Sequence, residues 1–397
     1  MQTSCPTERS RLLADRVEAF VRETVIPYES DERCTSHGPS EELVAELRTK
    51  AQEAGLMTPH ILADGSHLSQ LETAAVLKRS GLSPLGPVAV NTASPDEGNM
   101  FLLGKIATAG QKARFLAPLI EGKARSAFFM TEPASEGGAG SDPSMLQTRA
   151  VRDGTDWIIT GRKTFITGAK GASVGIVMAL TDSSERPKAT MFLVHLPDPA
   201  VRIERVLDTI DNSMPGGHAQ VLFDQLRVPD SQVLGEVDEG FRYAQIRLAP
   251  ARLSHCMRWL GAATRAQEIA TRYATTRKAF GQLLIDHEGV GFMLADNLID
   301  LQQAALMTDW CAAVLDSGAI AAVESSMAKV AVSELLFRVA DRCVQVMGGS
   351  GVSRDSIVEQ VFREIRAFRI YDGPTEVHKW SIAKKIKRDA LSGGKHG

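Results

Sequence analysis

Several kinds of residue are scarce in this sequence, and each scarcity excludes a class of protein. Of its 397 residues only five are cysteines, and no two of them form a Cys-x-x-Cys pair. An odd number of scattered cysteines is typical of reduced thiols and lacks the ligand spacing of a zinc site, so we expect no metal centre and a cytoplasmic location. Cys256, Cys311 and Cys343 lie in apolar helical stretches, which favours buried, unreactive thiols.

A strong net positive charge and long apolar runs are also missing. The formal net charge is −3, so a nucleic-acid partner is not expected. No run approaches the roughly 18 apolar residues of a membrane span, and none is expected. The N-terminus has no apolar core of a signal peptide, and a helical pattern starts near residue 10, so we expect no removable leader.

What remains is the composition of an ordinary globular protein, 44% hydrophobic and 23% charged. Its apolar periodicity changes twice along the chain. Up to residue 125 the spacing is helical, then short alternating runs between turn residues such as Asp153-Gly154 predict strands, and beyond residue 237 long aliphatic and alanine-rich stretches predict a helix bundle. We therefore predict an α+β fold with domains at 1–125, 126–236 and 237–397. Individual helices are predicted at 68–80, 99–120, 239–278, 288–317 and 320–347, with a last helix from about residue 374.

Two segments of the predicted β domain suit a flat, polar-edged ligand. The run FFMTEPASEGGAGSD at 128–142 contains glycines that permit close main-chain approach, and hydroxyls and amides that can donate to an anion. The run GRKTFITGA at 161–169 places Phe165 and Thr167 on one face of a strand, an aromatic to cover a ring and a hydroxyl to bond its edge. Taken alone, the first run is equally well a flexible turn, and the second a half-buried strand.

Helical segments add charged groups. Arg277, followed by Phe280-Gly281, could clamp a diphosphate and stack on a heterocycle, although a solvated helix end is commoner for one arginine. Arg252 lies earlier on the same predicted helix and suits a substrate anion, a salt bridge to a catalytic carboxylate or a surface position. A glycine-rich turn at 345–351 and Asp372, in the run IYDGPTEVHKW, complete the set.

The order and spacing of these segments resemble the acyl-CoA dehydrogenase family over essentially the whole chain. The matching motifs are MTEP…AGSD at 130–142, KxFITG at 163–168, RKxFG at 277–281, QxxGGxG at 345–351 and Tyr-acid-Gly at 371–373. The resemblance implies an N-terminal helical domain, a central β-barrel domain and a C-terminal four-helix bundle. It also implies non-covalently bound FAD, an acyl-CoA substrate, an electron-transfer flavoprotein as acceptor, and a homotetramer or homodimer.

The resemblance also assigns cofactor residues position by position. Thr131 is expected to donate to the polar edge of the flavin, and Ser141 to approach the CoA portion as well as the flavin. In the β domain the implied flavin residues are Phe129, Met130, Thr131, Ser141, Phe165, Ile166 and Thr167. In the C-terminal region the implied FAD residues are Arg277, Phe280, Gln345, Val346, Gly348, Gly349, Thr375 and Glu376.

Asp372 occupies the family position of the catalytic base, where most members have glutamate. The implied reaction removes the α-proton of an acyl thioester with this carboxylate while the β-hydrogen leaves as hydride to the flavin. Arg252 and Gly373 fall where the family contacts the base and the substrate. An aspartate reaches about 1.5 Å less far than a glutamate, and the DGPxEVH run resembles a subgroup that carries this aspartate. Ala251 stands at the alternative base position of the family, so Asp372 has no rival.

Two other functions stay open. A flavin oxidase resembling nitroalkane oxidase would also use an aspartate base, and oxygen consumption with nitroalkanes would identify it. A non-catalytic, flavin-loaded binding homologue associated with DNA would need a basic surface, which a net charge of −3 does not favour.

The long loop at 134–140 is expected to reshape the CoA entrance. Glu288, which replaces a family glutamine, is not expected to bind the cofactor.

Overall fold

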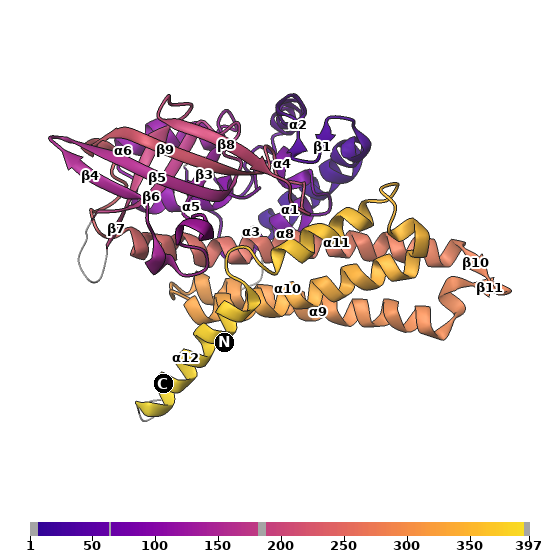
Figure 1. The fold of residues 1–397 in the computed structure, drawn as a ribbon. Helices are drawn as coiled ribbons and strands as arrows, with labels where there is room; N and C mark the ends of the chain where they lie inside the picture. The colour runs from indigo at the N-terminus through magenta and orange to yellow at the C-terminus, as the bar shows by residue number, and fades with distance from the viewer. Residues whose placement is uncertain (1–6, 63–64, 182–187, 393–397) are drawn as a thin grey trace. The chain divides into compact units, whose positions relative to one another are not determined.

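The computed structural model of the chain describes residues 7–62, 65–181 and 188–392 (Figure 1). Cys5 lies outside the described residues. Internal contacts divide the chain into two compact units. Unit 1 comprises Met1–Glu29, Ser69–Gly86 and Ala249–Gly397, and unit 2 comprises Ser30–Leu68 and Pro87–Leu248.

Unit 1 is helical. The long helices α9 and α10 pack along each other, and α11 and α12 both contact α10 (Figure 1). Small and aliphatic side chains such as Ala328, Val332 and Leu336 are fully buried on α10, so packing of one apolar face holds this long helix. The elements are α1 Glu8–Phe20, α3 Gln70–Ser80, most of α8 Gly240–Thr276, α9 Glu288–Asp316, α10 Ala322–Met347, α11 Ile357–Phe368, α12 Thr375–Leu391, and a hairpin of β10 Lys278–Ala279 and β11 Gln282–Leu283.

Polar contacts tie the helices of unit 1 together at defined points. The carboxylate of Asp316, at the end of α9, accepts the main-chain N–H groups of Gln70 at 2.6 Å and Leu71 at 3.0 Å. It thereby caps the N-terminus of α3, where the helix dipole favours an anion. Further along α9, Asp300 accepts from Arg338 at 2.9 Å and Arg342 at 2.8 Å on α10. These contacts hold α9 against α3 and α10.

Unit 2 contains a seven-stranded sheet in the order β3-β6-β4-β5-β9-β8, with β7 pairing β6. Strands β3 and β6 run parallel, and β5 pairs antiparallel with β9. Gly154, at positive φ, lies in the two-residue turn that joins β4 to β5. The strands are β3 Ser126–Phe129, β4 Arg149–Asp153, β5 Asp156–Thr167, β6 Val174–Leu180, β7 Ala189–His195, β8 Val201–Leu207 and β9 His218–Pro229, with a separate pair β1 Cys34–Thr35 and β2 Gly38–Pro39.

Both faces of the sheet are covered near β6 and β7. Along β6, Ile176 and Met178 belong to one apolar cluster, and Val177 and Ala179 to a second cluster. A strand buried on both faces needs a continuous apolar sequence, which β6 has. Side chains of α5 and α7 complete the first cluster. The helices of this part are α2 Glu41–Glu53, α5 Asp96–Ile106, α6 Ala109–Gln111 and α7 Ala117–Ile120, with the short α4 Gly86–Ala89.

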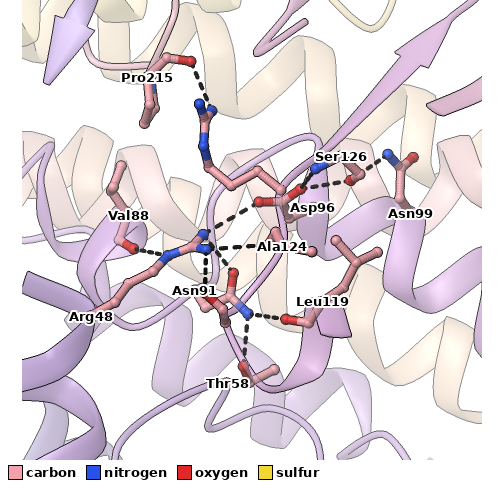
Figure 2. Close-up of polar contacts among 12 residues, drawn as sticks. Arg48, Thr58, Val88, Asn91, Asp96, Asn99, Leu119, Ala124, Ser126 and Pro215 are labelled. Atoms are coloured by element: carbon pink, nitrogen blue, oxygen red, sulfur yellow. Dashed lines mark hydrogen bonds and ion pairs between the residues drawn. The ribbon is translucent and has the colours of Figure 1, made fainter. Parts of the chain in front are cut away.

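A buried polar network joins α2 and α5 to the start of β3 (Figure 2). The guanidinium of Arg48 donates to the side chain of Asn91 at 2.9 Å and to the carbonyl of Ala124 at 3.3 Å. Asp96 accepts the main-chain N–H and the hydroxyl of Ser126, both at 2.6 Å. Burial lowers the pKa of Arg48, although the nearby Asp96 opposes this. Because each buried polar group has partners, the network holds the first residue of the sheet in place.

The structure confirms most predicted elements and corrects others. The helix predicted at 99–120 is wrong as one helix, because α5 ends at Ile106 and a capping box between Thr108 and Gln111 starts a new one. Strands β4 and β8 lie within the region predicted to contain strands, but no specific sequence run indicated them. The three helical cysteines are buried as predicted, and burial raises the pKa of Cys311 and Cys343 to about 12. The limits of the three domains stay predictions.

None of the helices in the described residues is both long and apolar enough to cross a bilayer. Within the same residues, His, Cys, Asp and Glu side chains form no group of three that could hold a metal ion.

Candidate active site

Asp372 lies in the short loop between α11 and α12, in an unusual backbone conformation. Its φ is 51°, in the left-handed region that side chains other than glycine seldom adopt. The next residue, Gly373, has φ 105°, and a Cβ there would lie 2.5 Å from Nε2 of His378. Such strain persists only where neighbouring groups hold it, and it concentrates at functional sites.

Three side chains from three helices hold this loop by its carbonyl groups. Arg252 on α8 donates through Nε to the carbonyl of Asp372 at 3.0 Å, and His378 on α12 lies 3.1 Å from the same oxygen. Lys329 on α10 donates to the carbonyl of Gly373 at 2.9 Å. Arg252 therefore contacts the main chain of the proposed base. The clamp explains how the strained turn is kept.

The carboxylate of Asp372 faces a histidine whose tautomer the structure determines. Nε2 of His255 lies 3.3 Å from Oδ2 of Asp372, and Arg258 donates to Nδ1 of the same ring at 3.1 Å. Because arginine only donates, Nδ1 must be the unprotonated acceptor, and Nε2 carries the hydrogen that Asp372 accepts. The side chain of His255 is 4% exposed, whereas that of Asp372 is 22% exposed. The carboxylate is thus supported from inside and accessible from outside.

Buried cations surround this carboxylate. Burial lowers the pKa of Lys329 to about 8, although Cys256 and Asp372 act in the opposite direction. Burial, with Arg252 and Lys329 nearby, lowers the pKa of His378 to about 4, so that this ring is neutral at physiological pH. Since Nε2 of His378 faces a carbonyl, it carries the hydrogen and donates. Positive charge close to a carboxylate favours its ionised form, the state required of a base.

The remaining unit 1 residues predicted to bind FAD are placed as follows. Arg277 directly follows α8 and is exposed, and Phe280, in the β10–β11 hairpin, is 97% exposed. Gly348 and Gly349 are exposed, with open space where a Cβ would be. The others differ in exposure: Gln345 and Glu376 are exposed, Val346 is buried, and Thr375 is buried with its hydroxyl donating to Glu334 at 2.8 Å. Val346 and Thr375 therefore face the interior of their own unit.

In unit 2, two residues that were predicted to contact the flavin have buried side chains. The side chains of Phe129 and Ile166 are 0% and 1% exposed and belong to the second apolar cluster, where Phe129 packs edge-to-face on Phe223. Contact of these two residues with a flavin stays a prediction, and their side chains themselves pack into the apolar core. The cause for Ile166 is a register irregularity in β5 between Lys163 and Ile166 that shifts the alternation.

Other predicted flavin residues of unit 2 are accessible. Phe165 is 62% exposed at φ 55°, next to the irregularity, and Met130 and Thr131 are half-buried. The hydroxyl of Thr131 donates to the carbonyl of Thr164 at 2.5 Å. Its single hydrogen is therefore already used, and only the main-chain N–H of Thr131 could donate to a ligand. Thr167 is half-buried and its hydroxyl contacts His218. Ser141 is exposed on the loop that the sequence showed to be long.

A buried ion pair, absent from the sequence predictions, anchors that loop. Lys163 and Glu132 are 0% and 1% exposed and 2.8 Å apart. The Glu132 carboxylate also accepts the main-chain N–H groups of Gln147 at 2.6 Å and Thr148 at 2.9 Å, at the far end of the loop. Burial lowers the pKa of Lys163 to about 8 while Glu132 opposes the shift. Both ends of the loop are therefore held by one charged group.

Only weak indications of these supporting residues are present in the sequence. His255 follows Arg252 by three positions, which places both on one helix face. Lys329 and His378 are single polar residues in helices, a pattern that equally fits a solvated surface. Their roles depend on contacts between distant segments, which one sequence does not reveal.

Comparisons with known proteins agree on one family. Family models of the acyl-CoA dehydrogenase N-terminal, middle and C-terminal domains match residues 7–123, 127–225 and 238–387, respectively. The chain is 36% identical over 382 residues to FadE2 of Mycobacterium tuberculosis, named a probable acyl-CoA dehydrogenase, with 93% of each chain covered. It is 36% identical over 386 residues to acyl-CoA dehydrogenase family member 11 of Gallus gallus, covering 93% of this chain and 49% of that protein. The chain thus spans about half the length of that relative.

Solved structures show the same fold. An acyl-CoA dehydrogenase candidate from Mycobacterium abscessus superimposes with a TM-score of 0.88 at 33% identity, covering 98% of this chain and 100% of that one. Butyryl-CoA dehydrogenase of Megasphaera elsdenii gives 0.85 at 25% identity, with 98% and 100% covered. The predicted fold class is confirmed. Matches to all three domain descriptions and to a full-length relative show that the chain belongs to the acyl-CoA dehydrogenase family, a family of oxidoreductases.

Proposed function

We propose that this chain is an FAD-dependent acyl-CoA dehydrogenase that oxidises the α,β bond of an acyl-CoA thioester, with Asp372 as the base. The observation that carries the proposal is the environment of Asp372. Its carboxylate is partly exposed and held by a neutral histidine, while buried cations clamp the backbone behind it. A general base needs this combination of access, fixed direction and an ionised resting state.

The residues present fit FAD. Exposed main-chain groups at Gly348 and Gly349 and the exposed guanidinium of Arg277 are the kinds of donor that bind a diphosphate. Phe280 and Phe165, both largely exposed, offer faces for flat rings. When bound, FAD would supply the acceptor for the β-hydride. Thr167 and the main chain near Met130 are proposed to contact the flavin, and the exposed Gln345 and Glu376 to contact FAD from their helices.

The chain's own residues account for the proton-transfer half of the reaction. Asp372 removes the α-proton and holds it on its carboxylate, while the hydrogen bond from Nε2 of His255 keeps the carboxylate in one direction. Arg252 and Lys329 keep the loop from relaxing as the negative charge of Asp372 is neutralised. We assign Gly373 and Ser141 to the substrate, through the loop main chain and the exposed hydroxyl respectively.

The test is anaerobic reduction of the flavin by a panel of short, long, branched and hydroxylated acyl-CoAs. Asp372→Asn should bind FAD normally, because asparagine also tolerates the left-handed backbone, and should slow flavin bleaching about 10²- to 10⁴-fold. Asp341→Asn, at an exposed position on α10, is the matched control and should bleach at the normal rate. Bleaching of the Asp372→Asn protein at near-normal rate would place the base elsewhere. Oxygen consumption with nitroalkanes would favour the oxidase alternative, which also uses an aspartate.

We propose that electrons pass to an electron-transfer flavoprotein and that the chain forms a homodimer or homotetramer. A chain from a study of the electron-transferring flavoprotein of Acidaminococcus fermentans has the same fold, with a TM-score of 0.86 at 26% identity. Exposed apolar side chains at heptad spacing on α9, Phe292, Ile299 and Leu306, support self-association. Leu306→Lys should reduce the solution mass measured by light scattering, whereas the exposed Gln302→Lys on the same helix should not.

A further inference from the structure

A chain of three side chains ends at Thr167, the last residue of β5. Thr167 pairs directly with His218, the first residue of β9. Oγ1 of Thr167 lies 2.9 Å from Nδ1 of His218, and Nε2 of His218 lies 2.9 Å from Oδ2 of Asp211. The side chains of His218 and Asp211 are 13% and 9% exposed. The arrangement is a buried Asp–His pair behind a hydroxyl that reaches the accessible end of the strand.

The hydrogen positions follow from the partners. Burial raises the pKa of the Asp211 carboxyl, but the hydrogen bond from His218, the charge interaction with that ring and the hydrogen bond from Thr209 together lower the pKa overall, which favours the ionised carboxylate. An ionised carboxylate only accepts, and Nε2 of His218 must therefore carry a hydrogen. With hydrogen on Nε2 alone, Nδ1 accepts and the hydroxyl of Thr167 donates to it, whereas a ring with hydrogen on both nitrogens would donate to Thr167 instead. The first arrangement commits the single hydroxyl hydrogen of Thr167 to the protein interior.

We propose that Asp211 and His218 are positioning residues that fix the direction of the Thr167 hydroxyl, so that Thr167 presents its oxygen to the bound flavin as an acceptor. This inference rests on the proposed function, because Thr167 is assigned to the flavin there. Reduction adds an N–H group to a flavin, and an acceptor at the ring therefore favours the reduced form. The hydroxyl so directed makes the flavin a better oxidant of the substrate.

The same contacts could serve only to tie β5 to β9, and a substitution at Asp211 separates the two roles. Asp211→Asn keeps a side chain of the same shape and can keep the bond to His218, but its amide can donate to Nε2. The ring would then carry its hydrogen on Nδ1 and donate to Thr167, which frees the hydroxyl to donate outward. The strands stay tied while the hydrogen bond reverses.

The experiment measures the midpoint potential of the flavin by spectroelectrochemistry in the holoenzyme. Asp211→Asn should lower the equilibrium constant for flavin reduction about tenfold, which for a two-electron couple is a shift of about 30 mV to more negative potential. Thr167→Val should also lower the potential, and adding Asp211→Asn to it should give no further shift. An unchanged potential in Asp211→Asn, or an equal shift without the threonine hydroxyl, would overturn the proposal.

A second measurement needs no turnover. The nitrogen-15 chemical shifts of the labelled imidazole of His218, assigned by loss of its signal in His218→Gln, report which nitrogen carries hydrogen. The wild-type protein should show hydrogen on Nε2 and none on Nδ1, and hydrogen on Nδ1 would contradict the inference. Failure of acyl-CoAs to bleach the flavin would overturn the proposed function while leaving this tautomer result in place.

Discussion

The Asp372 site of unit 1 and the Thr167 end of the sheet in unit 2 each contain a His–Asp pair. The two regions differ in which residue is accessible. The pairs are His255–Asp372 at 3.3 Å and His218–Asp211 at 2.9 Å. In the first pair the aspartate is the accessible member, and the histidine behind it is held by an arginine. In the second the aspartate is buried, and a threonine is the accessible end.

Each region also contains a buried lysine whose pKa is lowered to about 8 by burial. Lys163 is paired with the carboxylate of Glu132, while Lys329 donates to the carbonyl of Gly373. Residue types alone therefore do not define the role of such a cluster. What defines it is which member is accessible, and whether the buried cation neutralises an acid or holds a strained backbone.

The largest expected effect is on the ion pair of unit 2. Glu132→Gln leaves Lys163 buried without its counter-charge and should lower the free energy of unfolding by about 3–5 kcal/mol near pH 6. Because Lys163 already has a pKa of about 8, it can lose its proton cheaply above that pH, and the loss should be smaller at pH 9. Urea unfolding at the two pH values measures this. Glu136→Gln, in an exposed pair with Arg162, is the control and should change stability little.

Replacing the lysine of unit 1 should change the pH dependence of stability instead. The pKa of Lys329 is about 8 in the folded chain and 10.5 in its ordinary state, so the unfolded chain binds more protons between these values. Stability of the wild type relative to Lys329→Met should therefore rise with pH from about 8 to about 10.5, by up to about 3 kcal/mol. A difference in unfolding free energy between the two proteins that stays constant from pH 8 to pH 10.5 would show that the pKa of Lys329 is not lowered by folding.

The smallest effect distinguishes the two histidines. His255→Gln should retain FAD but slow flavin reduction by acyl-CoA about 10- to 100-fold, since Asp372 loses its fixed donor. His218→Gln should slow it only a few-fold, because the histidine acts through the hydroxyl of Thr167. Stopped-flow reduction under anaerobic conditions compares them directly. Equal losses in both variants would remove the distinction between a pair that supports the base and a pair that directs a hydroxyl.

The sequence was sufficient for the order of elements, because apolar periodicity is a local property of the chain, while the assignment of Asp372 as the base stays a prediction from ordered motifs. It could not place Phe129 and Ile166, whose side chains turn into the core. For Ile166 the reason is a register irregularity that depends on how β5 pairs with β9. Nor could it find Lys329, whose partner is a carbonyl 44 positions later in the sequence. Features set by pairing between distant segments escape a reading of one sequence.

The left-handed backbone at Asp372 has a consequence for how this position can evolve. Aspartate, asparagine and glycine accept that conformation at low cost, whereas longer side chains pay more for it. A mutation of Asp372 to glutamate would therefore be disfavoured by the conformation of the loop. Reaching that residue would require prior changes at the clamp formed by Arg252, Lys329 and His378. The loop conformation therefore restricts which residues position 372 accepts. We expect a saturation library at this position to yield folded protein mainly for aspartate, asparagine and glycine.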